Sequence, residues 1–194
     1  MEDAIVSTRN LLLLLSVLAF SWTSVAAQTG NAKHFAKEGL SFDYPAGWTL
    51  EDASDGDAQK LKLSRADGDI QLAVFVHRGH ITEEKMADAH KTFIDPYVTS
   101  FPQQFPGAKV ERTADATEVA GVKAEGTRLK MSFGADSATA QIYWTLVNGR
   151  VVILTFFGPD ADRKKFASSW DMLRSTLKIE EAKPAAPKPS PTPK

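Results

Sequence analysis

The sequence predicts an α+β protein, an α-β-α sandwich in which helices cover a central antiparallel sheet of about 6–7 strands. Tight-turn dipeptides separate several apolar runs, and this arrangement is typical of antiparallel hairpins. Two other segments repeat apolar residues every three to four positions, which predicts amphipathic helices that cover the sheet. With 194 residues, the chain is long enough for one such domain with residues left over for tails.

The hairpins are predicted from glycine-containing turns. Asp67-Gly68 and Asn148-Gly149 both suit the type I′ turn, in which both central residues have positive φ. Gly121 separates a third pair of strands, and the arm before it, residues 109–120, alternates only loosely. We therefore expect an antiparallel hairpin at each glycine, with an irregular stretch in the arm that precedes Gly121.

The hairpin at Asn148-Gly149 is expected at the centre of the sheet. Its two arms, residues 141–147 and 151–157, are apolar at both odd and even positions, so both faces of these strands should be buried. Residues 60–66 differ, because Leu61 and Leu63 alternate with lysines and a serine. One face of that strand should therefore meet water.

The first helix is expected at about residues 83–100. Thr82 can cap it, and the acidic residues that follow favour its N-terminal end. Pro96 should kink or divide the helix near Ile94, because proline cannot donate a backbone hydrogen bond. The apolar stripe of this helix comprises Met86, His90, Phe93, Tyr97 and Phe101.

The second helix is expected at about residues 159–176, with Pro159 at the first helical position and acidic residues in the first turn. Its buried stripe comprises Phe166, Trp170, Leu173 and Leu177. The residues expected to face water are Arg163, Lys164, Lys165 and Arg174.

The N-terminus resembles an export signal. Residues 11–20 are an apolar run that is shorter than the ~20 residues of a membrane span, and small residues follow at Val25 and Ala27. We predict a signal peptide at residues 1–27 with cleavage after Ala27, and an exported protein that is periplasmic or secreted. The acidic residues near Met1 fit this poorly, so an uncleaved anchor remains the alternative.

The rest of the chain divides into a flexible leader (28–33), one domain (34–181) and a tail (182–194). The tail holds five of the ten prolines, three lysines and no acid, which predicts a disordered spacer; a basic arm for an anionic envelope polymer or lipid is the alternative. Removal of residues 1–27 takes away one base and two acids, which leaves 22 of each from the original 23 and 24. A chain with zero net charge argues against nucleic acid as a partner.

Candidate catalytic residues are absent from the sequence. It has no cysteine, no G-x-S-x-G pattern and no glycine-rich phosphate loop, and no cofactor is expected. His77 and His80 are spaced so that both imidazoles could bind a transition metal, although a solvated loop is the simpler interpretation. His90 is expected at the edge of the core with a backbone partner. The tryptophans expected to pack in the core, with a sugar platform as the alternative, are Trp48, Trp144 and Trp170.

Two segments resemble the PsbP-like domains, a family that includes the extrinsic subunit of plant photosystem II and a Ran-binding nuclear import factor. LSFDYPAGW at 40–48 is similar to the start of those domains, and ILTFFGPDADRKKFASSWDMLRSTLKI at 153–179 is similar to their end. The turn around VAGVKAEG, residues 119–126, resembles their middle hairpin. The resemblance covers about residues 34–181 and implies an α-β-α sandwich that binds or assembles more often than it catalyses.

The chain departs from its relatives in ways that limit this inference. It lacks the basic N-terminal arm of the photosystem proteins and the cysteine of lipoprotein members, so neither a photosynthetic nor a Ran partner follows. We predict an exported, monomeric, non-catalytic domain that binds a protein or a cell-envelope component. The alternative is a small-molecule or metal-binding protein, or a weak hydrolase, with a site near His77 and His80. A purely structural role in envelope maintenance is the third interpretation.

Overall fold

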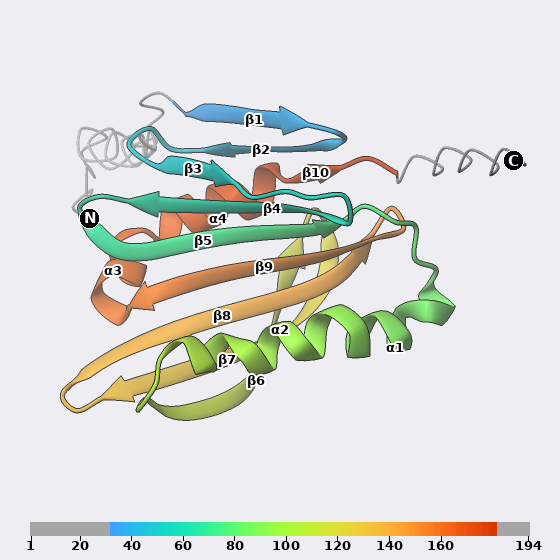
Figure 1. The fold of residues 1–194 in the computed structure, drawn as a ribbon. Coiled ribbons are helices and arrows are strands. Elements are labelled where there is room, and N and C mark those ends of the chain that lie inside the picture. Colours follow the sequence, from blue (N-terminus) through green and yellow to red (C-terminus); the bar gives the residue numbers. More distant parts are fainter. Residues whose placement is uncertain (1–31, 182–194) are drawn as a thin grey trace, which may run out of the picture. The chain divides into compact units, whose positions relative to one another are not determined.

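The computed structural model describes residues 32–181 (Figure 1). The predicted signal peptide with its cleavage point after Ala27 and the predicted tail (182–194) lie outside the described residues, as does the leader (28–33) up to residue 31. Lys33, the last residue assigned to the leader, begins the first strand. No helix within residues 32–181 is long and apolar enough to cross a membrane.

The centre of the fold is a seven-stranded sheet in which every neighbouring pair is antiparallel. The strand order is β3-β4-β5-β9-β8-β7-β6. The strands are β3 (Thr49–Asp52), β4 (Ala58–Arg65), β5 (Gly68–His77), β6 (Lys109–Val119), β7 (Val122–Phe133), β8 (Asp136–Val147) and β9 (Arg150–Pro159). The predicted α+β sandwich and its strand number are confirmed.

The hairpin of β8 and β9 lies inside the sheet, as its composition predicts. β9 is the middle strand, with three neighbours on each side in the strand order, and eight of its ten residues are buried. At the edge, β6 pairs with β7 without a register shift, so the irregular stretch expected there is absent from the described strand.

The turns agree with the prediction at two positions and disagree at one. Asn148 and Gly149 have φ of 49° and 72°, and Ala120 and Gly121 have φ of 51° and 76°, as the type I′ turn requires. The hairpin at Asp67 forms, but the type I′ prediction there is wrong. Gly68 already belongs to β5 and pairs with Arg65, so it is not a central residue of the turn. The pairing of β4 with β5 shifts register between Ser64 and Arg65.

One face of the sheet is covered by a helical segment that runs from residue 83 to 104. It consists of η1 (Glu83–Lys85), α1 (Met86–Ala89), the π-helical turn η2 (His90–Ile94), α2 (Asp95–Ser100) and η3 (Phe101–Gln104). Pro96 divides the segment as expected: the backbone N–H of Asp95 donates to the carbonyl of His90, five residues back. Thr82 occupies the N-cap position, but its hydroxyl makes no cap hydrogen bond.

The other face is covered by α3 (Asp160–Lys165), α4 (Ala167–Thr176) and a small sheet in the order β1-β2-β10. The small sheet was not anticipated as a unit; it comprises β1 (Lys33–Lys37), β2 (Leu40–Tyr44) and β10 (Lys178–Ile179). The predicted second helix is broken at Phe166 because this residue has φ of −107° and ψ of 17°, outside the helical range.

Two arginines on these helices were wrongly expected to face water. Arg163 lies over the ring of Phe156 at 4.9 Å, and Arg174 lies over the ring of Trp170 at 5.5 Å. Their side chains are only 15% and 23% exposed. An arginine stem can cover an aromatic ring while its charged head reaches polar partners at the edge, which amphipathic patterning alone does not reveal.

Candidate functional site

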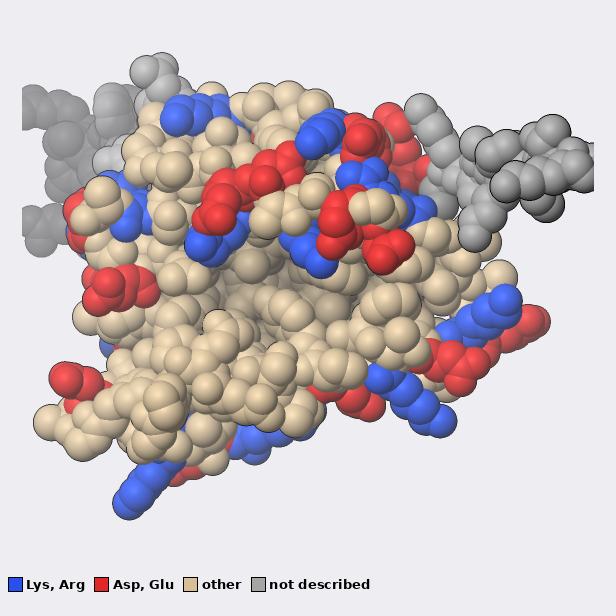
Figure 2. Space-filling model, viewed as in Figure 1, with Lys and Arg blue, Asp and Glu red and all other residues tan. Residues whose placement is uncertain are grey.

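A groove opens on the helical face of the sheet. It lies between strands β4 and β5 and residues 92–104 of the helical segment, and its volume is about 630 Å³. The segment packs over β7, β8 and β9 but leaves the same face of β4 and β5 uncovered. Figure 2 shows the groove as an uncharged hollow between a charged border over β3 and β4 and the helical segment below.

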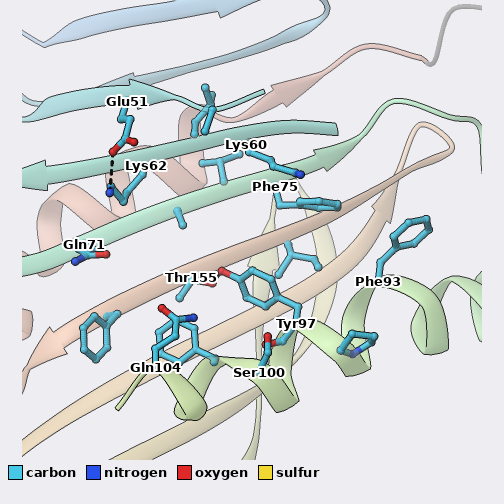
Figure 3. Close-up of a pocket in the computed structure, with 18 of the residues that line it drawn as sticks. Glu51, Lys60, Lys62, Gln71, Phe75, Phe93, Tyr97, Ser100, Gln104 and Thr155 are labelled. Carbon is cyan, nitrogen blue, oxygen red and sulfur yellow. Dashed lines mark hydrogen bonds and ion pairs between the residues drawn. The ribbon is translucent and has the colours of Figure 1, made fainter. Parts of the chain in front are cut away.

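Strand alternation explains why the floor of the groove is apolar. In β5, Leu72, Val74 and Val76 are fully buried under the opposite layer, so the residues between them point into the groove. The apolar side chains of the floor and wall include Phe75 and Phe93 (Figure 3). The others are Ala73, Phe101, Ile153 and Phe157. A pocket with a mainly apolar lining and few polar groups is the usual form of a ligand site.

The polar groups inside the groove satisfy one another. The hydroxyl of Tyr97 lies 2.9 Å from that of Thr155, and burial raises the pKa of Tyr97 above its usual value. Ser100 donates to the carbonyl of Tyr97, and Gln104 comes from the same wall (Figure 3). A protonated tyrosine bonded to a threonine is neither a general base nor an activated nucleophile at neutral pH.

Two ion pairs mark the opposite border of the groove. Lys60 Nζ lies 2.5 Å from a carboxylate oxygen of Asp55, and Lys62 Nζ lies 2.7 Å from one of Glu51. The hydrogen bond from Lys60, with those from the backbone of Ala58 and Asp57, lowers the pKa of Asp55 to about 2. All four charged side chains remain about half exposed to solvent.

The two predicted metal candidates occupy separate packing environments. The ring of His77 packs on Phe93 with 4.5 Å between centroids, and its Nδ1 lies 3.2 Å from the carbonyl of Gly79. His80 lies against Gly149, where an added Cβ would meet its ring at 2.3 Å. Among residues 32–181, no group of three or more metal-ligating side chains gathers. His77 thus adjoins the groove through Phe93, whereas the sequence singled out His77 as a metal ligand.

His90 has a different partner from the one expected. Its Nδ1 lies 3.0 Å from a carboxylate oxygen of Asp95, not beside a backbone group, and its ring packs edge-on against Trp144. His90 and Trp144 line a second, smaller hollow of about 490 Å³. Trp48 and Trp170 are 2% and 6% exposed, so neither presents a free face to a sugar.

Sequence reasoning missed the groove but contained part of its signal. Phe93 and Tyr97 were expected in the buried stripe of the first helix, yet both are only half buried and line the groove. The alternation of Lys60 and Lys62 with buried leucines correctly indicated an uncovered strand face. The sequence did not indicate that the helical segment lies over β7, β8 and β9, because this position depends on packing between residues distant in the chain.

Comparisons with known proteins identify the fold. No family model and no curated protein matches the chain. The solution structure of cyanobacterial PsbP from Synechocystis sp. PCC 6803 matches with a TM-score of 0.53 and 16% identity, over 79% of this chain and 95% of that one. The chain therefore has a PsbP-like fold, as its opening and closing segments predict.

Two further solved structures match less well. A protein from Bacteroides thetaiotaomicron has a TM-score of 0.49 and 13% identity, over 77% of this chain and 48% of that one. LpqN of Mycobacterium tuberculosis, described as involved in cell envelope biogenesis, has a TM-score of 0.44 and 13% identity, over 77% and 90%.

Proposed function

We propose that this protein is an exported, monomeric, non-catalytic binding domain whose binding site is the groove. The observation that carries the proposal is the uncovered apolar floor beside Phe75, Phe93 and Phe157. Exposed aromatic surface of this kind is unfavourable in water and usually marks a contact site. Its volume of about 630 Å³ lies within the ~300–1,000 Å³ range of ligand pockets.

A binding role accounts for the groove better than catalysis does. Its interior polar groups, Tyr97 and Thr155, bond to each other, and its charged groups lie on the border as ion pairs. The export signal predicted at residues 1–27 supports a role outside the cytoplasm, where a domain can meet envelope components. Metal binding near His77 and His80 lacks a third ligand among residues 32–181 and is therefore the weaker candidate.

The proposal is tested with a neutral fluorescent probe, N-phenyl-1-naphthylamine, whose emission increases in an apolar site. The wild-type protein should bind the probe saturably. Ala73→Trp fills the floor of the groove and should abolish binding, whereas Ala116→Trp, the same change at an exposed position of β6, should not. Circular dichroism must show that both variants fold. Equal probe binding by the two variants would contradict a site in the groove.

A further inference from the structure

We infer that the groove binds a single-chain amphiphile with a small anionic headgroup, such as a fatty acid. The acyl chain would lie on the apolar floor, and the headgroup would lie beside Lys60 and Lys62. This inference rests on the proposed function, because it names the ligand of the same site.

The charges around the groove are distributed unevenly. Among the residues that line it, Lys60, Lys62 and Glu51 are charged, and all three come from β3 and β4 (Figure 3). The helical wall contributes only uncharged side chains, between Thr92 and Gln104. Both positive charges of the lining therefore lie on one border, and each is paired with an acid. Asp55, the partner of Lys60, lies outside the lining. A ligand with an apolar chain on the floor and an anionic group turned towards this border matches the arrangement.

The two lysines can accept an additional anion. Their side chains are 47% and 48% exposed, and those of their partners Asp55 and Glu51 are 48% and 60% exposed. Exposed ion pairs contribute only about 0–1 kcal/mol, so they exchange easily. Each ammonium group also has three donor hydrogens, and one acidic partner leaves donors available for a carboxylate or phosphate.

The floor favours an acyl chain over a peptide. A peptide segment in the groove would place backbone N–H and C=O groups on a sheet face, where the strands' own backbone groups already pair with each other. Apart from the charged border, the uncharged side-chain partners are Gln71, Thr92, Ser100 and Gln104, since Tyr97 and Thr155 bond to each other. Unpaired buried backbone groups are costly, whereas an acyl chain has none.

The dimensions also suit a single chain. At about 30 Å³ for each water-sized group, a volume near 630 Å³ holds roughly 20 heavy atoms. The wall from residue 92 to residue 104 spans about 18 Å at ~1.5 Å per residue. A chain of twelve to sixteen carbons with a small headgroup satisfies both limits, and a lipid with two such chains exceeds the volume.

The inference is tested by displacing N-phenyl-1-naphthylamine with amphiphiles of equal chain length, each below its micelle concentration. We expect dodecanoate to displace the probe at concentrations at least tenfold lower than dodecyl maltoside or dodecyltrimethylammonium. Acetate, which has the headgroup without the chain, should not displace it. The variant Lys60→Met/Lys62→Met keeps the apolar stems and should reduce the headgroup preference to less than twofold while still binding the probe.

Two matched controls separate local charge from net charge. Lys109→Met/Lys130→Met removes the same charge from exposed positions of β6 and β7 and should leave the headgroup preference unchanged. Glu51→Gln removes the acid that pairs with Lys62 and should increase the preference for the anionic headgroup. A wild-type protein that binds the probe without any headgroup preference would overturn the inference and leave the proposed function intact.

Other occupants would give different results. Displacement by a peptide with an apolar helical face but by no amphiphile would overturn the inference, as would dimer formation that expels the probe, measured by light scattering. Absence of probe binding by the wild-type protein would instead reject the proposed function itself.

Discussion

The two faces of the seven-stranded sheet differ in how completely they are covered (Figure 1). On the face of α4, Trp170 stacks on Phe156 and Tyr143 with centroid separations of 5.3 and 6.1 Å, and Leu173 is fully buried beneath the helix. On the opposite face, the segment 83–104 covers β7, β8 and β9 and leaves Phe75 on β5 only half-buried. The first face is organised for stability, and the second retains surface that a ligand can use.

The buried polar groups show the same difference. On the closed face, Tyr143 donates to the carboxylate of Asp115, which also accepts from Gln141 and Arg128. On the open face, the hydroxyl of Tyr97 meets only another hydroxyl, that of Thr155. A hydrogen bond to a charged acceptor contributes about 1.5–3 kcal/mol and one between neutral groups about 0.5–1.5 kcal/mol.

The largest expected effect is that of Leu173→Ala on the closed face. Leu173 is fully buried among apolar side chains, so the cavity left by its removal should decrease the free energy of unfolding by about 2–5 kcal/mol. Phe75→Ala in the groove removes more atoms, but from a half-exposed site, and should cost less. Guanidinium denaturation of both variants measures the difference, and a greater loss from Phe75→Ala would refute the contrast between the faces.

Next in size is the pair Tyr143→Phe and Tyr97→Phe. Tyr143→Phe removes a donor from the half-buried Asp115 carboxylate and should lower the free energy of unfolding by about 1.5–3 kcal/mol, whereas Tyr97→Phe should cost about 0.5–1.5 kcal/mol. Thermal and chemical denaturation at pH 7 compare the two. Equal losses would show that the acceptor's charge does not matter here.

Alkaline pH should weaken the closed face through the same tyrosine. Burial, together with the hydrogen bond to Asp115 and its negative charge, raises the pKa of Tyr143 to about 12. Because the folded state holds the Tyr143 proton more tightly than the unfolded state, Tyr143 contributes fully to the free energy of unfolding below pH ~10. This contribution is lost as pH rises towards 12. We expect the unfolding midpoint to fall over this range, and to fall less in Tyr143→Phe. An identical decrease in both proteins would assign the effect to other groups.

The smallest expected effect on stability is that of Lys60→Met or Lys62→Met. These side chains form exposed ion pairs, so the free energy of unfolding should change by less than about 0.5 kcal/mol. Their effect should appear in ligand selectivity instead. Denaturation curves beside the displacement assay check this, and a loss above about 1 kcal/mol would mean that the border is part of the stable core.

Much of the sheet could be predicted because its information is local. The two positive-φ residues at Asn148 and Gly149 fix a hairpin, and the apolar content of its arms places it centrally. Leu61 and Leu63, alternating with lysines, correctly identified a strand with one open face. The hairpin of β1 and β2 is equally local, with positive φ at Glu38 and Gly39, and was missed. The pairing of β2 with β10 could not be predicted, because residues 40–41 meet 178–179 only in the folded chain.

The groove was unpredictable for a related reason. Phe93 and Tyr97 have the spacing of a buried stripe, and whether such residues are covered depends on where the helix lies over the sheet. Arg163 and Arg174 show the opposite error, since charged residues at helical surface positions turned out to lie over aromatic rings. Patterning identifies which residues can be buried, and long-range packing decides which of them are.

The π turn at His90–Ile94 has a consequence for how this protein can evolve. Such a turn holds an extra residue relative to an α-helix, so a single deletion within it would restore regular α-helix. Each residue of an α-helix advances the chain by about 100° of rotation, and Tyr97 and Phe101 would then swing away from the groove. Natural insertions and deletions should therefore accumulate in the hairpin loops and be rare between residues 90 and 94.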